Sequence, residues 1–173
     1  TYGSNVGPEY FANHVTLHYF GYFTWGTCTS RFGQLNTIYE NLKSQGYDVE
    51  LIGVANSSQS SSFGNWTSSN NSPVCVDNSS NNAWGNWDAS QRDLFILDTN
   101  GDLVFHDNIT SGIPPDLESI IIGLLTTDGP LVIDSFDEGL SDDYGYFMND
   151  NADPAYGFLN SSASNFENAQ CVK

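Results

Sequence analysis

Basic residues are scarce in this sequence. Its 173 residues include 4 Lys and Arg against 21 Asp and Glu, which gives a formal net charge of −17 at pH 7. Such a surface repels phosphate backbones, whereas a nucleic-acid-binding protein needs a basic patch. The charge balance therefore argues against a nucleic-acid partner. It is typical of a solvated acidic surface, or of one that holds divalent cations loosely.

Long apolar runs are also missing. The longest, IIIGLL at 120–125, is far shorter than the ~18 residues that a membrane-spanning helix needs. The first ten residues, TYGSNVGPEY, have neither the basic end nor the apolar stretch of a signal peptide, and the chain does not begin with Met. We therefore expect a mature chain whose leader has been removed, with no membrane span.

Sequons for N-linked glycosylation are frequent. The pattern N-x-S/T occurs at six positions, Asn56, Asn65, Asn70, Asn78, Asn108 and Asn160. This density favours a secreted, extracellular glycoprotein. In an oxidising compartment we expect one disulfide and one odd cysteine among the three cysteines, which are Cys28, Cys75 and Cys171.

Apolar periodicity predicts an α/β domain over residues 14–126, an N-terminal arm over 1–13 and an acidic, aromatic-rich extension over 127–173. The predicted strands are 14–20, 48–55, 73–76 and a hairpin over 93–107 that turns at Asn100-Gly101; the predicted helices contain 32–42, ending at Gly46, and 114–125. A helix between the first two strands implies that they are parallel, whereas the hairpin is antiparallel. The expected architecture is a mixed central sheet flanked by helices.

Signals for a metal site are weak. Residues 98–102, DTNGD, resemble a fragment of a calcium loop but lack its later Gly and bidentate Glu, so a hairpin turn is the better interpretation. His14 and His18 would share one face of a strand about 13 Å apart, too far to chelate one metal. We expect these two histidines and His106 to be structural or surface residues, and we expect neither a metal nor a cofactor.

Four segments together resemble the N-terminal domain of selenoprotein P. They are VTLHYFGYFTWGTC, LKSQGYDVELIGVAN, SPV and DLFILDTNGDLVFH, in this order and spacing, and the resemblance covers about residues 14–125. It implies a thioredoxin-like fold and a U-x-x-C redox site, which falls on Trp25, Gly26, Thr27 and Cys28. It also implies a cis-proline at Pro73 that faces this site. Because Trp25 replaces the selenocysteine or first cysteine, the motif is degenerate and we expect no catalytic residue.

Cys28 and Trp25 each allow more than one interpretation. We expect a Cys28–Cys75 disulfide, which leaves Cys171 as the odd cysteine. Alternatively, one of the first two cysteines pairs with Cys171 and fastens the extension, or Cys28 is a reactive thiol. We expect Trp25 to fill the vacated site by packing; alternatively, it forms an exposed platform for a ligand beside Tyr22 and Phe23.

The leading hypothesis is a secreted, N-glycosylated thioredoxin-fold protein that has lost its redox nucleophile. It would act as an extracellular structural or interaction protein, with self-association through the extension as one role open to it. A first alternative is a thiol–disulfide oxidoreductase or peroxide-reducing protein that uses Cys28 with Cys75 or Cys171. A second alternative is a carrier that binds a small ligand or calcium.

Overall fold

The computed structural model describes residues 11–78, 80–127 and 170–172. Its strands are β1 (Val15–Gly21), β2 (Val49–Ala55), β3 (Val74–Val76), β4 (Asp93–Leu97), β5 (Leu103–Asn108) and β6 (Gln170–Val172). Its helices are α1 (Gly26–Ser44), the 3-10 helix η2 (Ser57–Gln59), α2 (Gly64–Thr67), α3 (Ala83–Asn86) and α4 (Leu117–Thr127). The predicted strands and the two predicted helices are confirmed, with ends shifted by a few residues.

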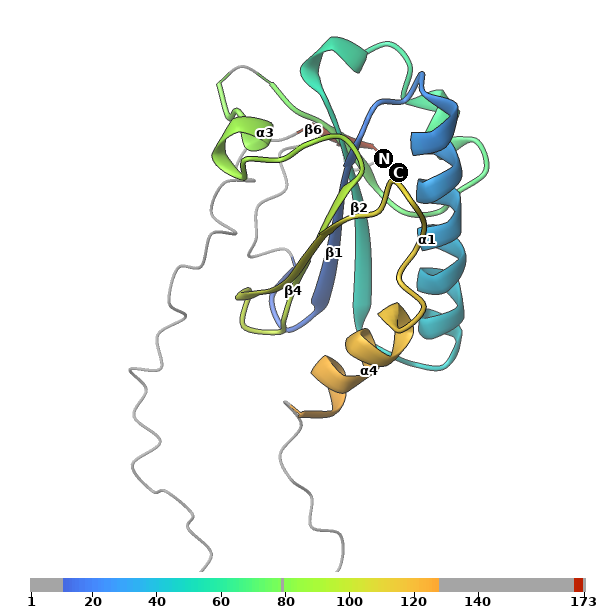
Figure 1. Ribbon diagram of the computed structural model, residues 1–173, viewed down its shortest axis with the longest axis vertical. Helices are drawn as coiled ribbons and strands as arrows, with labels where there is room; N and C mark the ends of the chain where they lie inside the picture. Colours follow the sequence, from blue (N-terminus) through green and yellow to red (C-terminus); the bar gives the residue numbers. More distant parts are fainter. Residues whose placement is uncertain (1–10, 79, 128–169, 173) are drawn as a thin grey trace, which may run out of the picture.

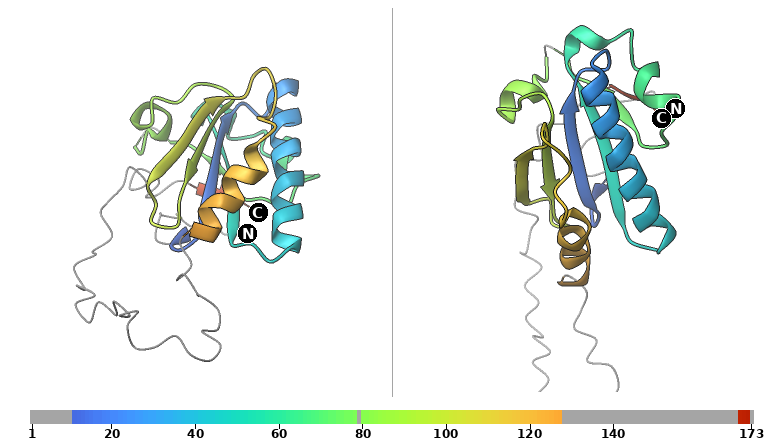
Figure 2. Two further views of the ribbon diagram at one scale, coloured as in Figure 1. Left: turned by 60° about the horizontal axis from the view of Figure 1, so that its bottom comes forward. Right: turned by 45° about the vertical axis from the view of Figure 1, so that its right-hand side comes forward.

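The described strands form one six-stranded mixed sheet in the order β5-β4-β1-β2-β3-β6. β1, β2 and β3 are parallel to one another, whereas β4, β5 and β6 each pair in antiparallel fashion with a neighbour. α1 and α4 lie on one side of the sheet and α3 on the other (Figures 1 and 2). Asn41 on α1 donates its side-chain amide to Glu118 Oε1 on α4 at 3.2 Å. The predicted α/β architecture, a mixed central sheet flanked by helices, is therefore confirmed.

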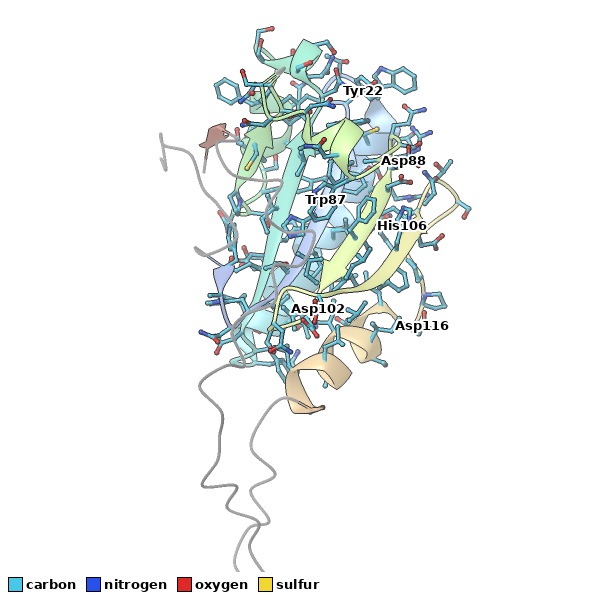
Figure 3. All side chains as sticks on the ribbon, turned by 90° about the vertical axis from the view of Figure 1, so that its left-hand side faces the viewer. Tyr22, Trp87, Asp88, Asp102, His106 and Asp116 are labelled. Carbon is cyan, nitrogen blue, oxygen red and sulfur yellow. The ribbon has the colours of Figure 1, made fainter. Side chains whose placement is uncertain are left out.

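Both faces of the sheet are covered by hydrophobic clusters. Neighbouring residues of a strand point to opposite faces, so Tyr19 belongs to the cluster beneath α1 and α4, while Phe20 belongs to the cluster on the α3 side. Figure 3 looks onto the α3 side and shows Trp87 and His106 on that face. Trp87 meets Phe95 edge-on with ring centroids 5.1 Å apart, and His106 stacks on Phe95 at 4.1 Å.

Trp66 fixes the Ser- and Asn-rich segment 57–72 to the core. Its side chain is fully buried and stacks on Phe32 with ring centroids 4.5 Å apart. Its indole Nε1 donates to Thr29 Oγ1 on α1 at 3.2 Å. A Cβ at Gly53 would lie 2.9 Å from both the Trp66 and the Phe32 rings, so only glycine leaves room for this indole. Trp66 therefore packs between the sheet and the first turns of α1 and supports them.

In the hairpin turn, the Asp98 carboxylate binds backbone amides of the turn itself. Asp98 Oδ1 accepts hydrogen bonds from the backbone amides of Asn100 and Asp102, each at 2.9 Å, and Gly101 adopts a positive φ of 85°. Only a residue without a Cβ adopts that conformation readily. The carboxylate serves the turn, and the hairpin interpretation of residues 98–102 is confirmed.

The predicted cis-proline at Pro73 is wrong. The described residues contain no cis peptide bond, so the Ser72–Pro73 bond is trans. The Pro73 carbonyl accepts a hydrogen bond from the Gly53 amide at 3.0 Å, directly before β3 pairs in parallel with β2. An extended trans peptide thus continues the β2–β3 pairing.

Most of the predicted arm and extension, residues 1–10, 128–169 and 173, lie outside the described residues. At the arm's end, Phe11 packs against the cluster on the α3 side. Near the extension's end, β6 pairs in antiparallel fashion with β3. None of the described helices combines the length and apolar character that crossing a membrane requires.

Candidate functional site

The first turn of α1 contains a free thiol. Cys28 is the third residue of the helix, and its side chain is fully buried beneath it. Trp25, the residue before the helix, is its N-cap but makes no side-chain capping bond. Because Cys28 is free, the predicted Cys28–Cys75 disulfide is wrong.

The sheet separates Cys28 from Cys75. Val74 belongs to the same cluster as Cys28, whereas Cys75, the next residue along β3, belongs to the cluster on the opposite face. Cys75 is disulfide-bonded, and the backbone of β6 places Cys171 directly opposite Cys75 in the strand register. These are the positions that the alternative pairing of Cys75 with Cys171 requires. The odd cysteine is therefore Cys28, and the prediction that Cys171 is the odd one is wrong.

Arg92 contacts the thiol directly. Its Nη1 donates to Cys28 Sγ at 3.7 Å, and its Nε donates to Thr110 Oγ1 at 2.7 Å. Arg92 has a left-handed backbone with φ 71°, a conformation that costs a non-glycine residue about 1–2 kcal/mol. Its backbone is fixed by two hydrogen bonds, Arg92 N to Phe20 O at 2.7 Å and Ile109 N to Arg92 O at 2.9 Å. The fold thus maintains an unfavourable conformation that places a guanidinium at the sulfur.

A second arginine lies at the same place. Arg31, one turn further along α1, donates through Nε to the Ile109 carbonyl at 2.9 Å and through Nη2 to the Thr110 carbonyl at 3.1 Å. Within the described residues neither arginine has a carboxylate partner, whereas Lys43 is paired with Glu50 at 3.1 Å. Two of the chain's four basic residues therefore converge beside one cysteine in a protein whose formal net charge is −17.

Tyr19 provides a hydroxyl next to Cys28. Its OH donates to the Cys28 carbonyl oxygen at 3.3 Å. Burial raises the pKa of Tyr19 above its usual range, and the neighbouring Cys28 side chain raises it further, partly offset by the positive charges of Arg92 and Arg31. The phenol therefore stays protonated and remains a hydrogen-bond donor.

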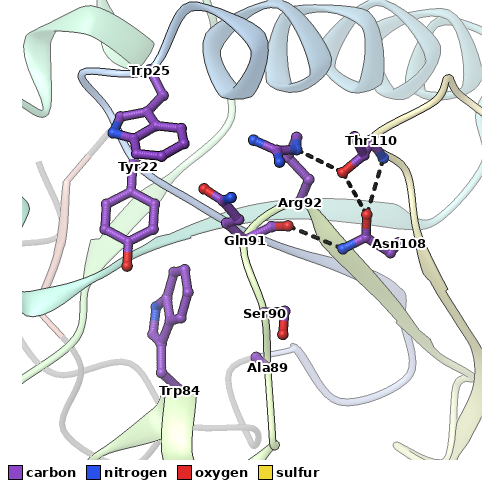
Figure 4. A pocket seen from close by; sticks show the side chains of 9 residues that line it. All are labelled: Tyr22, Trp25, Trp84, Ala89, Ser90, Gln91, Arg92, Asn108 and Thr110. Carbon is purple, nitrogen blue, oxygen red and sulfur yellow. Dashed lines mark hydrogen bonds between the residues drawn. The ribbon is translucent and has the colours of Figure 1, made fainter.

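An open pocket of about 600 Å³ adjoins this cluster. It shares Arg92 with the thiol site. Figure 4 shows three aromatic side chains along one side of the pocket and polar side chains along the other; the lining residues used below are Tyr22, Trp25, Trp84, Gln91, Arg92, Asn108 and Thr110.

Trp25 forms part of the pocket wall and does not fill the core. It is 50% exposed and stacks on Tyr22 with ring centroids 5.5 Å apart and an interplanar angle of 30°. Tyr22 in turn meets Trp84 edge-on at 5.4 Å. Phe23, by contrast, is buried and packs edge-on against Trp66 at 4.9 Å. The prediction that Trp25 packs into the vacated site is therefore wrong. Trp25 instead forms the exposed aromatic surface of the alternative interpretation, together with Tyr22 but without Phe23.

The sequons differ in how their amide nitrogens are used. The Nδ2 atom already donates a hydrogen bond at Asn65, Asn70 and Asn108. At Asn108 it donates twice, to Gln91 O at 3.0 Å and to Asp93 Oδ1 at 2.6 Å. At Asn56 the Oδ1 accepts from Ser58, and Nδ2 makes no hydrogen bond to the part of the chain that the structure describes. Asn78 accepts through Oδ1 from nearby backbone amides, and Asn160 lies outside the described residues.

The histidines make contacts within the protein. Burial lowers the pKa of His18 to about 3, so this side chain is neutral, and its Nε2 lies 3.0 Å from Thr16 Oγ1. His106 Nε2 lies 3.4 Å from Asp93 Oδ2, and His14 Nδ1 lies 3.0 Å from the Ala12 carbonyl. Among residues 11–78, 80–127 and 170–172, no group of three or more His, Cys, Asp or Glu is placed to hold a metal.

Sequence reasoning missed Arg92, Trp84 and Thr110. Each lies in or next to a polar segment whose path cannot be inferred from local patterns, and the three meet only through the tertiary fold. The one available signal was the rarity of basic residues, of which the chain has four.

The fold is thioredoxin-like, as the comparison with known proteins shows. No protein-family model and no curated protein matches the chain. A thioredoxin-like protein from Porphyromonas gingivalis is 16% identical, matches 69% of this chain and 80% of its own, and has a TM-score of 0.57. DsbE from Chlorobium tepidum, a thiol:disulfide interchange protein, is 13% identical over 72% of this chain and 90% of its own, with a TM-score of 0.54. Trgpx in its apo form is 15% identical over 70% of this chain and 86% of its own, with a TM-score of 0.53.

Proposed function

We propose that this protein is a thiol-dependent redox protein in which Cys28 reduces small peroxides. The observation that supports this most directly is the hydrogen bond from Arg92 Nη1 to Cys28 Sγ at 3.7 Å. A guanidinium donor can balance the negative charge that a reacting sulfur bears. Arg31 adds a second positive charge to the same cluster, and the Tyr19 hydroxyl lies beside it. The thioredoxin-like fold, which DsbE shares, agrees with such chemistry without establishing it.

The burial of Cys28 favours a small oxidant. A protein disulfide is too large to reach a fully buried sulfur, whereas a hydroperoxide needs to bring only one oxygen to it and a small external thiol only one sulfur. In the proposed step an S–O bond forms as the O–O bond breaks. The sulfur is oxidised by two electrons to a sulfenic acid, and the thiol proton leaves with the alcohol or water that is released.

An external thiol completes the proposed cycle. Because Cys75 is disulfide-bonded and faces the other side of the sheet, it is not placed to resolve an oxidised Cys28. One external thiol would condense with the sulfenic acid, releasing water and forming a mixed disulfide. A second external thiol would then release Cys28 and leave as a disulfide with the first. This form of the redox hypothesis replaces the one in which Cys28 works with Cys75 or Cys171.

The proposal retains the cellular setting inferred from the sequence. Six sequons and a disulfide-bonded Cys75 support a secreted glycoprotein. The resemblance to the selenoprotein P N-terminal domain supports a redox ancestry in which Trp25 replaced the nucleophile. A non-catalytic interaction protein is the second candidate, and the half-exposed ring of Trp25 favours it. Self-association through the extension and calcium binding stay predictions.

The test is peroxide consumption with dithiothreitol as the external thiol, combined with trapping of sulfenic acid by dimedone and peptide mass mapping. We expect dimedone on Cys28 in the native protein and no thiol-dependent turnover in Cys28→Ser. Arg92→Gln should slow oxidation by about tenfold or more. Lys43→Gln removes the same charge at a surface ion pair and should leave the rate unchanged. Equal rates for the native protein and Cys28→Ser, or equal losses in the two charge variants, would contradict the proposal.

A further inference from the structure

We infer that the pocket between Trp25 and Arg92 is a binding site for a small aromatic carboxylate. The inference shares Arg92 with the proposed redox function, but it does not depend on Cys28 being reactive. It rests on three features of the pocket: unused donors on Arg92, an exposed aromatic wall, and a buried donor, Trp84 Nε1, that has no partner among the described residues.

Arg92 has donors left for an anion. A guanidinium carries five N–H groups in a planar fork. Its Nε donates to Thr110 and its Nη1 to Cys28, while Nη2 makes no hydrogen bond within the described residues. No carboxylate of the described part of the chain lies within ion-pair distance of Arg92. An arginine without a counter-charge on the wall of an open pocket, in a protein this acidic, is a site for an external carboxylate.

The opposite wall suits a flat ring. Trp25 and Tyr22 are already stacked, and Trp84 meets Tyr22 edge-on, so the three side chains present a continuous aromatic surface to the pocket (Figure 4). Half of the Trp25 surface is exposed. Aromatic rings pack favourably against one another in offset or edge-on geometry. A planar apolar group can therefore rest on this wall while its carboxylate points to Arg92.

Two polar atoms of the lining are unsatisfied. Trp84 Nε1 and Gln91 Oε1 are buried and have no hydrogen-bond partner among the described residues. Buried polar groups without partners are uncommon in native proteins and need an explanation. An acceptor oxygen of a ligand can engage Trp84 Nε1 if this side chain shifts slightly on binding, which makes the pocket a better candidate than an ordinary surface hollow. Gln91 Oε1 is itself an acceptor, so a carboxylate does not satisfy it.

The overall charge limits which anion fits. Every negative charge on a ligand is repelled by a protein of formal net charge −17. Polyphosphates and polyacids are therefore disfavoured, and one carboxylate is the charge that Arg92 can offset. The aromatic wall adds affinity that does not depend on charge.

The probe is benzoate, and the control is benzamide, an uncharged molecule of similar shape. Binding is measured by calorimetry and by Trp fluorescence in Cys28→Ser, so that loss of thiol chemistry cannot affect the result. We expect benzoate to bind about tenfold or more tighter than benzamide, and Arg92→Gln to abolish that preference. Trp25→Ala changes an exposed side chain, so it should fold normally, and it should weaken both probes. Lys43→Gln should change neither.

Benzamide binding as tightly as benzoate, an unchanged preference in Arg92→Gln, unchanged binding in Trp25→Ala, or no saturable benzoate binding would each overturn the inference. Benzoate binding without peroxide turnover in the native protein would retain this site and reject the proposed redox function, so the two failures are distinguishable.

Discussion

Replacing Trp66 by alanine should be among the most damaging single substitutions in this domain. The indole is fully buried, stacks on Phe32, and donates Nε1 to Thr29 Oγ1 at 3.2 Å. Truncating a buried Trp costs about 3–5 kcal/mol, which includes the cavity that it leaves. Against a typical free energy of unfolding of about 5–15 kcal/mol, that is at least about a fifth of the total stability.

Trp25→Ala is the matched control, because it makes the same chemical change at a side chain that is 50% exposed. We expect it to lower the free energy of unfolding by less than about 1 kcal/mol. Urea unfolding followed by circular dichroism measures both. With a slope near 2 kcal/mol per molar urea, Trp66→Ala should lower the midpoint by about 2 M, and Trp25→Ala by less than about 0.5 M.

The slopes must agree between the variants for the comparison to hold, since a changed slope means a changed unfolded or native state. If the two substitutions lower the midpoint equally, Trp66 is not part of the core. The assignment of segment 57–72 to the support of α1 would then be refuted, and with it the account of how Cys28 is positioned.

The other predictions concern protonation, backbone space and glycosylation. The folded-state pKa of His18, about 3, lies below its usual 6.5, so the unfolded state binds more protons between these values and stability falls as the pH drops from 6.5 towards 3. The difference in unfolding free energy between the native protein and His18→Gln, measured at each pH, should show this slope, roughly 1 kcal/mol per pH unit at most. A difference that does not change with pH contradicts the prediction. Gly53→Ala should destabilise the protein by about 1–3 kcal/mol because its Cβ would meet two aromatic rings. Gly123→Ala, which has open space around it in α4, should stabilise the protein by up to about 1 kcal/mol. Thermal melts in which both variants melt above the native protein, or both below it, would reject this pair of predictions. Mass mapping of the protein expressed through a eukaryotic secretory pathway should find a glycan on Asn56 and none on Asn108, whose Nδ2 already donates two hydrogen bonds. The reverse occupancy would be the contrary result.

Local sequence patterns were sufficient for the elements of the fold. Asn100-Gly101 between two apolar runs predicts the hairpin because the turn conformation selects those residues. Helical periodicity and Gly46 likewise predict α1 and its end. The side of the sheet that a residue faces is harder to predict in a short strand. β3 has three residues, and a shift of one exchanges Val74 with Cys75, so the face on which Cys75 lies was not predictable from the sequence.

The candidate site was predicted only in part. Trp25 and Cys28 were identified from a local motif, since their spacing at the start of a helix has a known meaning. Arg92 was not, because its role depends on a left-handed backbone conformation and on contacts with residues 64 and 18 positions away in sequence. Long-range convergence of this kind has no local signature. The predicted cis-proline at Pro73 was wrong for a related reason, since it came from the family resemblance and not from the residues around it.

The position of Cys28 and Cys75 on opposite faces of the sheet has a consequence for the chemical lifetime of the protein. Disulfide shuffling requires a thiolate to approach a disulfide sulfur directly. Here a layer of hydrogen-bonded backbone lies between the free thiol and the bonded sulfur of Cys75. The sheet therefore keeps the Cys28 thiol and the Cys75 disulfide apart within one small domain. A reduced cysteine and an oxidised one can persist together in the folded protein, and only unfolding would allow them to exchange.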